Sequence, residues 1–302
     1  MASVHPDQFL GLPPCPPEQA DAVVVPLPLE KTVSYGTGTW RAPRAILDAS
    51  CQVELFDEET LIDFSEFPRV HTAPPVVVDG SLEEYLAAIR DSVAAFRDKF
   101  VVALGGEHTV TFGCATGLVD RPAELTVVQI DAHADLMDEL DGRRWSHGTV
   151  IRRLWEEGCR LIQIGIRSLS RSEYDLATAD ERIRTYFAHR LGEQWNDLID
   201  TLRQLEGEVY LTIDVDGLDP SVIPTTGTPQ PNGLSWRQTM EVLHALTAAT
   251  RCRLVGADIV EFVASPHPPG CDIIVARLLA KILAWRFADS AAPPYPATQR
   301  RR

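Results

Sequence analysis

Short runs of β-branched and other apolar residues alternate along the chain with longer segments of helical period. Six such runs predict buried strands, at residues 21–29, 100–106, 125–131, 160–168, 208–216 and 252–262. Three segments begin with Ser, a favourable helix N-cap, and carry apolar residues at three- and four-residue spacing, which predicts helices over 81–99, 146–158 and 235–250. This alternation predicts an α/β fold, with a mostly parallel sheet and helices on both faces.

The two ends of the chain differ in composition from the middle. Residues 1–20 are Pro-rich and residues 289–302 are small, polar and Pro-rich. Segments of this kind have little apolar surface to bury, so we expect an N-terminal arm outside the compact part and a disordered C-terminal tail. Residues 21–288 are expected to form one α/β domain.

The charge balance narrows the class of partner. The chain has 43 acidic and 28 basic residues and a formal charge of −15, which argues against nucleic acid or an anionic membrane and is compatible with a small cationic substrate. No apolar run approaches a membrane span and the start lacks a signal-peptide pattern, so a cytoplasmic protein is expected. The six cysteines include no C-x-x-C pair, which predicts neither a disulfide framework nor a thiolate zinc site.

Four of the predicted strands end in carboxylates or imidazoles. The carboxyl ends of parallel strands meet at one edge of a sheet, where ligands of such folds bind. Taken singly, each of these residues reads best as a helix-capping carboxylate or a core histidine. Four such strand endings at one edge of a sheet are not expected by chance. They are Glu107 and His108, then Asp131, His133 and Asp135, then Asp214 and Asp216, then Asp258 and Glu261.

Carboxylates gathered at one edge repel each other unless cations are present, so this set predicts metal ions. Side-chain direction in a strand repeats every second residue, so the ligands within each Asp-x-His or Asp-x-Asp pair can point the same way. The candidate ligands are two histidines and four aspartates, namely His108, Asp131, His133, Asp135, Asp214 and Asp216. An oxygen-rich set of this size favours two manganese ions, or another divalent ion such as nickel, over a structural zinc site. Two such ions activate a water molecule, which predicts a hydrolase of a cationic electrophile.

The same residues lie in motifs that resemble a known family. The blocks "GGEHTV" (105–110), "DAHADL" (131–136), "SHGT" (146–149), "DVDGLDPSVIPTTGTPQPNGLSW" (214–236) and "DIVEF" (258–262) resemble, in order, the signature blocks of the ureohydrolase family of arginases and agmatinases. The resemblance covers most of the chain. It implies the three-layer arginase-like α/β fold, a binuclear manganese centre, hydrolysis of a guanidino compound to urea and an amine, and a homo-oligomer, a trimer or a hexamer.

The resemblance also implies residue roles. Asp131 and Asp214 would bridge the two ions, one of which would also bind His108 and Asp135 and the other His133 and Asp216. Asp135 would pass on a proton after hydroxide attacks the guanidinium carbon. His147 resembles the family's proton-shuttling histidine, and the residue pattern places it in a helical first turn whose N-cap is Ser146, where the helix dipole favours a neutral imidazole.

Further roles concern the substrate and the residues behind the ligands. Glu261 corresponds to the acid that holds the guanidinium, and Thr226 and Gly227 would help to shape its pocket. Asp258 is expected to orient a ligand histidine. The family usually has Asp at position 107 and Ser at position 109, so Glu107 and Thr109 leave the surroundings of His108 open.

Substrate choice is expected to lie in the loop 136–145. Arginases typically have Asn where this chain has Leu136. The loop offers three carboxylates, Asp138, Glu139 and Asp141, which would attract a distal ammonium and favour agmatine or aminopropylagmatine over arginine. Arg143 and Arg144 would instead favour a guanidino acid such as guanidinobutyrate. A solvated loop without a substrate role is an equal alternative, as is, for the whole chain, a non-catalytic paralogue.

Overall fold

The computed structural model describes residues 4–265 and 270–288. Eight strands form one sheet in the order β2-β1-β3-β8-β7-β4-β5-β6, and every neighbouring pair is parallel. The strands are β1 (Ala22–Leu27), β2 (Val70–Thr72), β3 (Phe100–Gly105), β4 (Leu125–Ile130), β5 (Arg160–Ile166), β6 (Ile183–Phe187), β7 (Gly207–Asp214) and β8 (Cys252–Val260).

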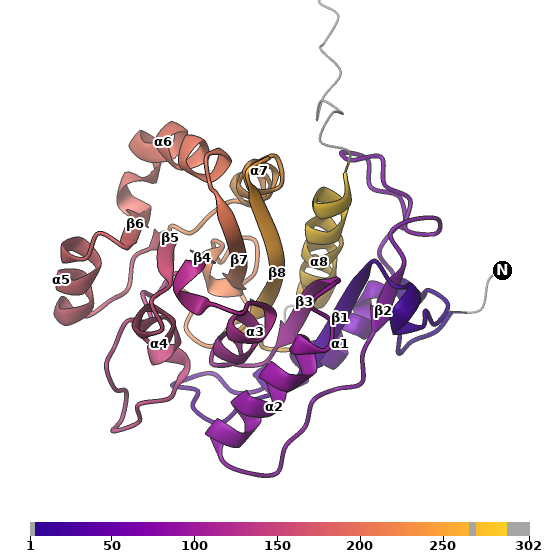
Figure 1. The fold of residues 1–302 in the computed structure, drawn as a ribbon, viewed down its shortest axis with the longest axis horizontal. Helices are drawn as coiled ribbons and strands as arrows, with labels where there is room; N and C mark the ends of the chain where they lie inside the picture. Colours follow the sequence, from indigo (N-terminus) through magenta and orange to yellow (C-terminus); the bar gives the residue numbers. More distant parts are fainter. Residues whose placement is uncertain (1–3, 266–269, 289–302) are drawn as a thin grey trace, which may run out of the picture.

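Helices cover both faces of this sheet, which gives three layers (Figure 1). One face packs against α1 (Ala42–Ser50), α6 (Leu191–Arg203), α7 (Trp236–Thr247) and α8 (Cys271–Phe287). The other packs against α2 (Leu82–Ala94), α3 (Val110–Leu118), α4 (Val150–Glu156) and α5 (Arg171–Ala179). The predicted fold class is confirmed.

Alternation along the strands divides the core into two clusters. In β1, Ala22 and Val24 face the α1 and α8 side, while Val23 and Val25 face the α2 and α3 side. All six residues of β1 are buried. A strand covered on both faces reads as a continuous apolar run rather than an alternating one, which is why the sequence predicts the central strands well.

The six predicted strands and three predicted helices are confirmed, with somewhat shorter bounds. The short strands β2 and β6 are not predicted, because β2 has three residues and β6 carries the exposed Arg184 at the sheet edge. The predicted helix at 146–158 begins as a separate 3-10 turn, His147–Thr149, before α4 starts at Val150. His147 therefore lies beside the start of α4 rather than inside it.

The expectation that residues 1–20 lie outside the compact part is wrong for Phe9 and Leu10. Both side chains are buried in the core. The backbone N–H of Phe9 donates to Thr72 Oγ1 and that of Leu10 to Ser50 Oγ, at 2.9 and 2.8 Å. Two adjacent apolar side chains are enough to anchor a Pro-rich segment whose average composition suggests solvation. Residues 289–302 lie outside the described part of the chain.

Within the described residues, none of the helices combines the length and the apolar character needed to cross a membrane. No disulfide bond joins any two of the six cysteines, all of which lie in the described part of the chain.

Candidate active site

The four strands whose ends carry candidate ligands are neighbours in the sheet. They stand in the order β3-β8-β7-β4, so their carboxyl ends bring His108, Glu261, Asp214 and Asp131 to one edge. Glycines at the ends of these strands allow the close approach. A Cβ on Gly217, directly after Asp216, would lie 2.6 Å from the backbone nitrogen of Asp131. We call this place the metal edge, which comprises His108, Asp131, His133, Asp135, Asp214, Asp216 and Glu261.

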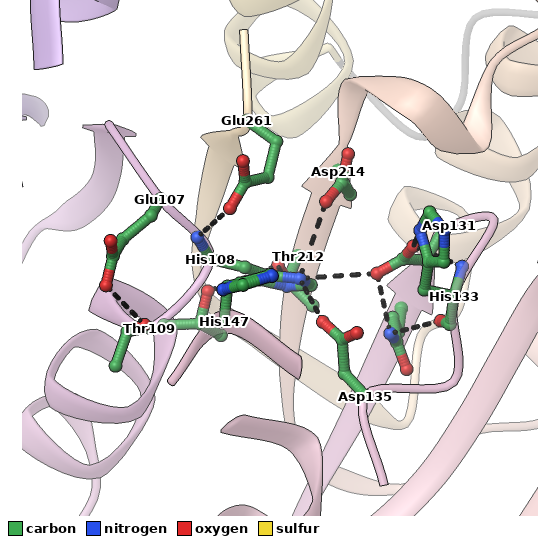
Figure 2. Close-up of polar contacts among 12 residues, drawn as sticks. Glu107, His108, Thr109, Asp131, His133, Asp135, His147, Thr212, Asp214 and Glu261 are labelled. Carbon is green, nitrogen blue, oxygen red and sulfur yellow. Dashed lines mark hydrogen bonds and ion pairs between the residues drawn. The ribbon is translucent and has the colours of Figure 1, made fainter. Parts of the chain in front are cut away.

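His108 lies at the centre of the metal edge (Figure 2). Its Nδ1 is 2.9 Å from an oxygen of Asp135, 3.2 Å from one of Asp131 and 3.6 Å from one of Asp214. On the far side of Asp131, His133 Nδ1 is 3.0 Å from Asp216. The structure therefore brings together all six predicted metal ligands.

The metal edge has a donor arrangement that suits cations. Two groups have ligand atoms within 4.8 Å of one another, His108 with Asp131 and Asp135, and His133 with Asp131 and Asp216, so that Asp131 belongs to both. His108 Nδ1 is fully buried and has no hydrogen-bond partner among the described residues. A buried nitrogen without a partner, surrounded by carboxylate oxygens, is the pattern expected where a metal ion completes the site.

The charges of the metal edge are unbalanced without such ions. Burial, together with the negative charges of Asp135 and Asp216, raises the pKa of Asp131 to about 7. Burial and the neighbouring Asp216 and Asp131 raise the pKa of Asp214 well above its usual range. Burial lowers the pKa of His133, but the hydrogen bond and charge of Asp216 outweigh it and raise that pKa to about 9. Protons are thus held where divalent cations would otherwise supply the positive charge.

A chain of hydroxyls orients the ring of His108. Thr212 Oγ1 lies 2.9 Å from His108 Nε2 and donates to Asp258 at 2.6 Å, while Tyr210 donates to the other oxygen of Asp258 at 2.8 Å. Since the Thr212 proton points to Asp258, Thr212 accepts from Nε2–H, which leaves the lone pair of Nδ1 toward the carboxylates. Asp258 thus contacts His108 through Thr212 rather than directly, and the sequence pattern did not indicate the part played by Thr212.

A buried pair of amides supports Asp131 in a similar way. Gln129 Nε2 donates to Asp131 at 2.8 Å, and Gln163 Nε2 donates to the side-chain oxygen Oε1 of Gln129 at 2.8 Å. Sequence reasoning missed both glutamines. Gln129 faces the same side as Asp131, because the two are two residues apart, and this alternation is the signal that could have identified it.

Two acidic residues of the site have left-handed backbone conformations. Asp135 has φ of 52° and Glu261 has φ of 62°. Non-glycine residues seldom adopt this region, and those that do are found in turns and are enriched at active sites. The conformation lets Glu261 turn back across the neighbouring strand end, where its Oε1 accepts the backbone N–H of His108 at 2.7 Å. Burial raises the pKa of Glu261 to about 8.

A pocket of about 230 Å³ opens onto the metal edge. Its wall includes Glu261, His147 and Gly227, three residues predicted from the family motifs, but Thr228 rather than Thr226. A Cβ on Gly36 would lie 2.8 Å from the Cα of Gly227, so two glycine-containing loops close the pocket backbone to backbone. A residue that sequence reasoning missed, Glu173 of α5, also lines it.

The charged residues of the loop 136–145 are not among the residues that line this pocket. The loop contributes Met137 and Leu140 to its wall. Asp138 accepts from Arg153 at 3.0 Å, and Arg144 pairs with Glu156 at 2.6 Å. Arg143 donates to the backbone carbonyl of Lys31 at 3.2 Å. These contacts favour the interpretation of the loop charges as structural.

Comparison with known proteins agrees with this geometry. The model of the arginase family matches residues 20–284. The chain belongs to the arginase family. Because the chain belongs to this family and resembles a ureohydrolase and an agmatinase, it is a hydrolase of carbon–nitrogen bonds.

Three similar proteins illustrate the relationship. The chain is 37% identical over 252 residues to an N(1)-aminopropylagmatine ureohydrolase of Thermus thermophilus, covering 82% of this chain and 84% of that protein. It is 29% identical over 278 residues to an agmatinase of Pyrococcus horikoshii, covering 91% and 95%. The crystal structure of an agmatine ureohydrolase of Thermoplasma volcanium superposes with a TM-score of 0.82 at 26% identity and covers 95% of this chain and 94% of that one.

Proposed function

We propose that this arginase-family protein is a binuclear manganese ureohydrolase that converts agmatine and water to putrescine and urea. The observation that carries the proposal is the pair of histidine and carboxylate clusters that share Asp131. They lie at the base of a pocket that also contains Glu261. N(1)-aminopropylagmatine is a second candidate substrate, because three relatives with that name are 33 to 37% identical to this chain and a fourth is 28% identical.

The metal edge would hold two divalent cations. His108, Asp135 and the shared Asp131 and Asp214 would bind one, and His133 and Asp216, with the same shared pair, would bind the other. Such ions supply a water molecule whose pKa is lowered toward about 7. Four aspartates and two imidazoles form a hard ligand set, which favours manganese over zinc, with nickel as the alternative.

Glu261 would hold the guanidinium group. Its Oε1 is occupied by the backbone N–H of His108, and its Oε2 lies toward Gly227 at the pocket wall. A planar guanidinium can donate to such an oxygen, and the buried setting strengthens the pairing. Asp135, whose carboxylate contacts His108 and lines the pocket, would accept a proton and pass it to the departing amine. His147 would exchange that proton with solvent.

The far end of the pocket suits an amine tail. Among the described residues that line the pocket there is neither a lysine nor an arginine to pair with a substrate carboxylate. Glu173 is the one lining carboxylate outside the metal edge, and it is buried, accepting the backbone N–H groups of Leu136 and Ser170 at 3.0 and 2.7 Å. A fixed negative charge at this wall favours a distal ammonium and disfavours a carboxylate.

A urea-release assay on manganese-loaded protein tests the proposal. Agmatine, N(1)-aminopropylagmatine, arginine and guanidinobutyrate would be compared by kcat/KM. We expect one of the two amines to exceed both guanidino acids by at least about 100-fold, since a repelled buried charge costs several kcal/mol. Preference for arginine or guanidinobutyrate would contradict the reading of the pocket, and two bound metals with no urea release from any of the four would favour a non-catalytic paralogue.

The variant Glu173→Gln refines that assay. It removes the charge while keeping the size, so KM for the preferred amine should rise about 10-fold with little change in kcat. Glu84→Gln is the matched control, because Glu84 is the corresponding N3 glutamate of the capping box of α2 and does not line the pocket. A homo-oligomer, a trimer or a hexamer as the family resemblance implies, is tested by light scattering on the same preparation.

A further inference from the structure

The carboxylate of Glu107 ties the segment after β1 to the metal edge. Glu107 is fully buried and directly precedes His108. Its Oε2 accepts the backbone N–H groups of Lys31 and Thr32, at 2.6 and 2.7 Å. Its Oε1 accepts the hydroxyls of Thr32 and Thr109, at 2.9 and 2.7 Å. These four donors occupy both oxygens of the Glu107 carboxylate. A carboxylate accepts hydrogen bonds and does not donate them, so the proton of the Thr32 hydroxyl points at Glu107.

The same Thr32 hydroxyl also contacts His147 twice. Its Oγ1 accepts the backbone N–H of His147 at 3.1 Å and lies 3.3 Å from Nδ1 of the ring. A hydroxyl has one proton and two lone pairs. Glu107 takes the proton and the backbone N–H takes one lone pair, so the second lone pair is left for Nδ1. Two acceptors in contact would repel, hence Nδ1 must carry hydrogen.

We infer that Glu107 and Thr32 are positioning residues that orient the His147 ring and fix a hydrogen on its Nδ1. Nε2 is then the basic nitrogen, on the side of the ring that meets Ser34 Oγ at 3.0 Å. Both Ser34 and His147 line the pocket, so Nε2 is the atom through which His147 exchanges protons there. The assignment of that task to His147 rests on the proposed function, whereas the tautomer follows from the hydrogen bonds alone.

These four hydrogen bonds explain why a glutamate suits position 107. The side chain of Glu107 reaches from the end of β3 to the backbone of residues 31 and 32 and also accepts the hydroxyl of Thr109. Asp, which the family usually has here, is one methylene shorter and would not reach all four donors from the same backbone position. Glu107 thus fixes the segment that bears both Thr32 and Ser34, and through them both nitrogens of the His147 ring.

The tautomer can be measured without substrate. Solid-state NMR on full-length protein labelled with ¹⁵N-histidine and loaded with diamagnetic Zn²⁺ separates protonated from bare ring nitrogens. The His147 signals are identified by their loss in His147→Gln. We expect hydrogen on Nδ1 in the wild type and in Thr32→Ser, and loss of that preference in Thr32→Val. Thr39→Val is the matched control, since buried Thr39 also donates to a glutamate, Glu30 at 2.9 Å, and should leave the His147 signals unchanged.

The kinetic counterpart uses the manganese enzyme. Thr32→Val should lower kcat by about 10-fold or more, part of the ~10²–10⁴-fold that a positioned acid or base contributes, with KM changed by less than about twofold. Thr32→Ser should restore it. Hydrogen on Nε2 in the wild type, or an unchanged tautomer in Thr32→Val, would overturn the inference. Absence of urea release from the wild type would instead refute the proposed function and leave the tautomer result standing.

Discussion

The molecule has two clusters of carboxylates that each include a fully buried aspartate, Asp131 in one and Asp57 in the other, and their charges are balanced in different ways. At the metal edge, five acidic side chains meet two imidazoles. Beside α8, Asp57, Glu58 and Glu59 surround Lys281, which is 1% exposed and lies 2.7 Å from Asp57. Arg277 adds a second cation, 2.6 Å from Glu58. We call this second group the Lys281 cluster.

The two clusters move the pKa of a buried aspartate in opposite directions. Burial raises the pKa of both Asp131 and Asp57. At Asp131 the neighbouring aspartates raise it further, to about 7. At Asp57 hydrogen bonds from Lys281 and Thr60 outweigh burial and bring the pKa below its usual range. The protein neutralises the Lys281 cluster with its own lysine, but it supplies no matching cation at the metal edge. The uncompensated negative charge of the metal edge therefore favours the binding of cations from solution.

The sharpest way to break this comparison is to remove the carboxylate that the two histidine groups share. Asp131→Ala should lose both metal ions and abolish urea release, because Asp131 contributes to each group. Metal-free Asp131→Ala should nevertheless be at least as stable as the metal-free wild type, since one repelling charge is gone. Metal analysis by mass spectrometry and thermal unfolding test both statements. Retention of two bound ions would refute the shared ligand.

The second prediction concerns the balanced cluster. Lys281→Met should lower the free energy of unfolding by about 3–5 kcal/mol, because it leaves Asp57 buried beside Glu58 and Glu59 without its cation. Metal content and urea release per folded molecule should not change. Denaturant unfolding measures the loss, with Arg277→Ala as the control, for which about 1 kcal/mol or less is expected at a partly exposed pair. A smaller loss for Lys281 than for Arg277 would contradict the comparison.

The sequence predicts the metal edge better than the Lys281 cluster for a physical reason. His108, Asp131, Asp214 and Glu261 all follow apolar runs, and strand ends in a parallel sheet meet at one edge, so their proximity follows from topology. Asp57 and Lys281 are 224 positions apart in a loop and a helix, and no periodic rule joins them. The same limit hides Glu173, which reaches the pocket from α5, and Thr32, which contacts His147 from the segment after β1.

Hydroxyls and amides behind the ligands are harder still to predict. Thr212 and Gln129 stand two residues before Asp214 and Asp131 on the same strands, so alternation places them on the ligand side. Their roles depend on single hydrogen bonds to His108 and Asp131, which composition and period do not specify. The prediction that residues 1–20 lie outside the compact part was wrong because it used average composition, which hides the two adjacent apolar residues Phe9 and Leu10.

The pH dependence of stability separates the clusters in a third way. His133 has a folded pKa of about 9, above its ordinary 6.5, so the folded state holds that proton more tightly and the stabilisation is full below pH 6.5 and lost as the pH rises to 9. Asp131, with a raised pKa, acts in the same direction at lower pH. Asp57, with a lowered pKa, loses its contribution only as the pH falls below about 3.8.

Metal-free protein should therefore lose on the order of 2–3 kcal/mol of unfolding free energy between pH 6.5 and 9. Metal-loaded protein should show no such decline, because bound cations replace the protons and bind more tightly as the pH rises. Urea unfolding with and without a chelator measures both curves. Parallel curves across this range would mean that the metal edge is balanced without ions.

The smallest effect is expected in the loop 136–145, for which the sequence predicts a role in substrate choice. Leu140 and Arg143 exchange backbone hydrogen bonds, at 3.0 and 2.9 Å, around Asp141 and Gly142, whose φ angles are 52° and 71°. This is the geometry of a type I′ turn, in which Asp-Gly is favoured. Asp141 is exposed at its tip and does not line the pocket.

Asp141→Asn keeps the left-handed conformation, which Asn adopts readily, and removes only the charge. KM for the preferred amine should change by less than about twofold, because an exposed charge is largely screened by solvent and salt. Glu173→Gln, measured beside it, supplies the larger shift expected from a buried charge at the pocket wall. If Asp141→Asn raised KM as much as Glu173→Gln, selection of the amine would lie in the loop after all, and the pocket would extend beyond the residues that line it here.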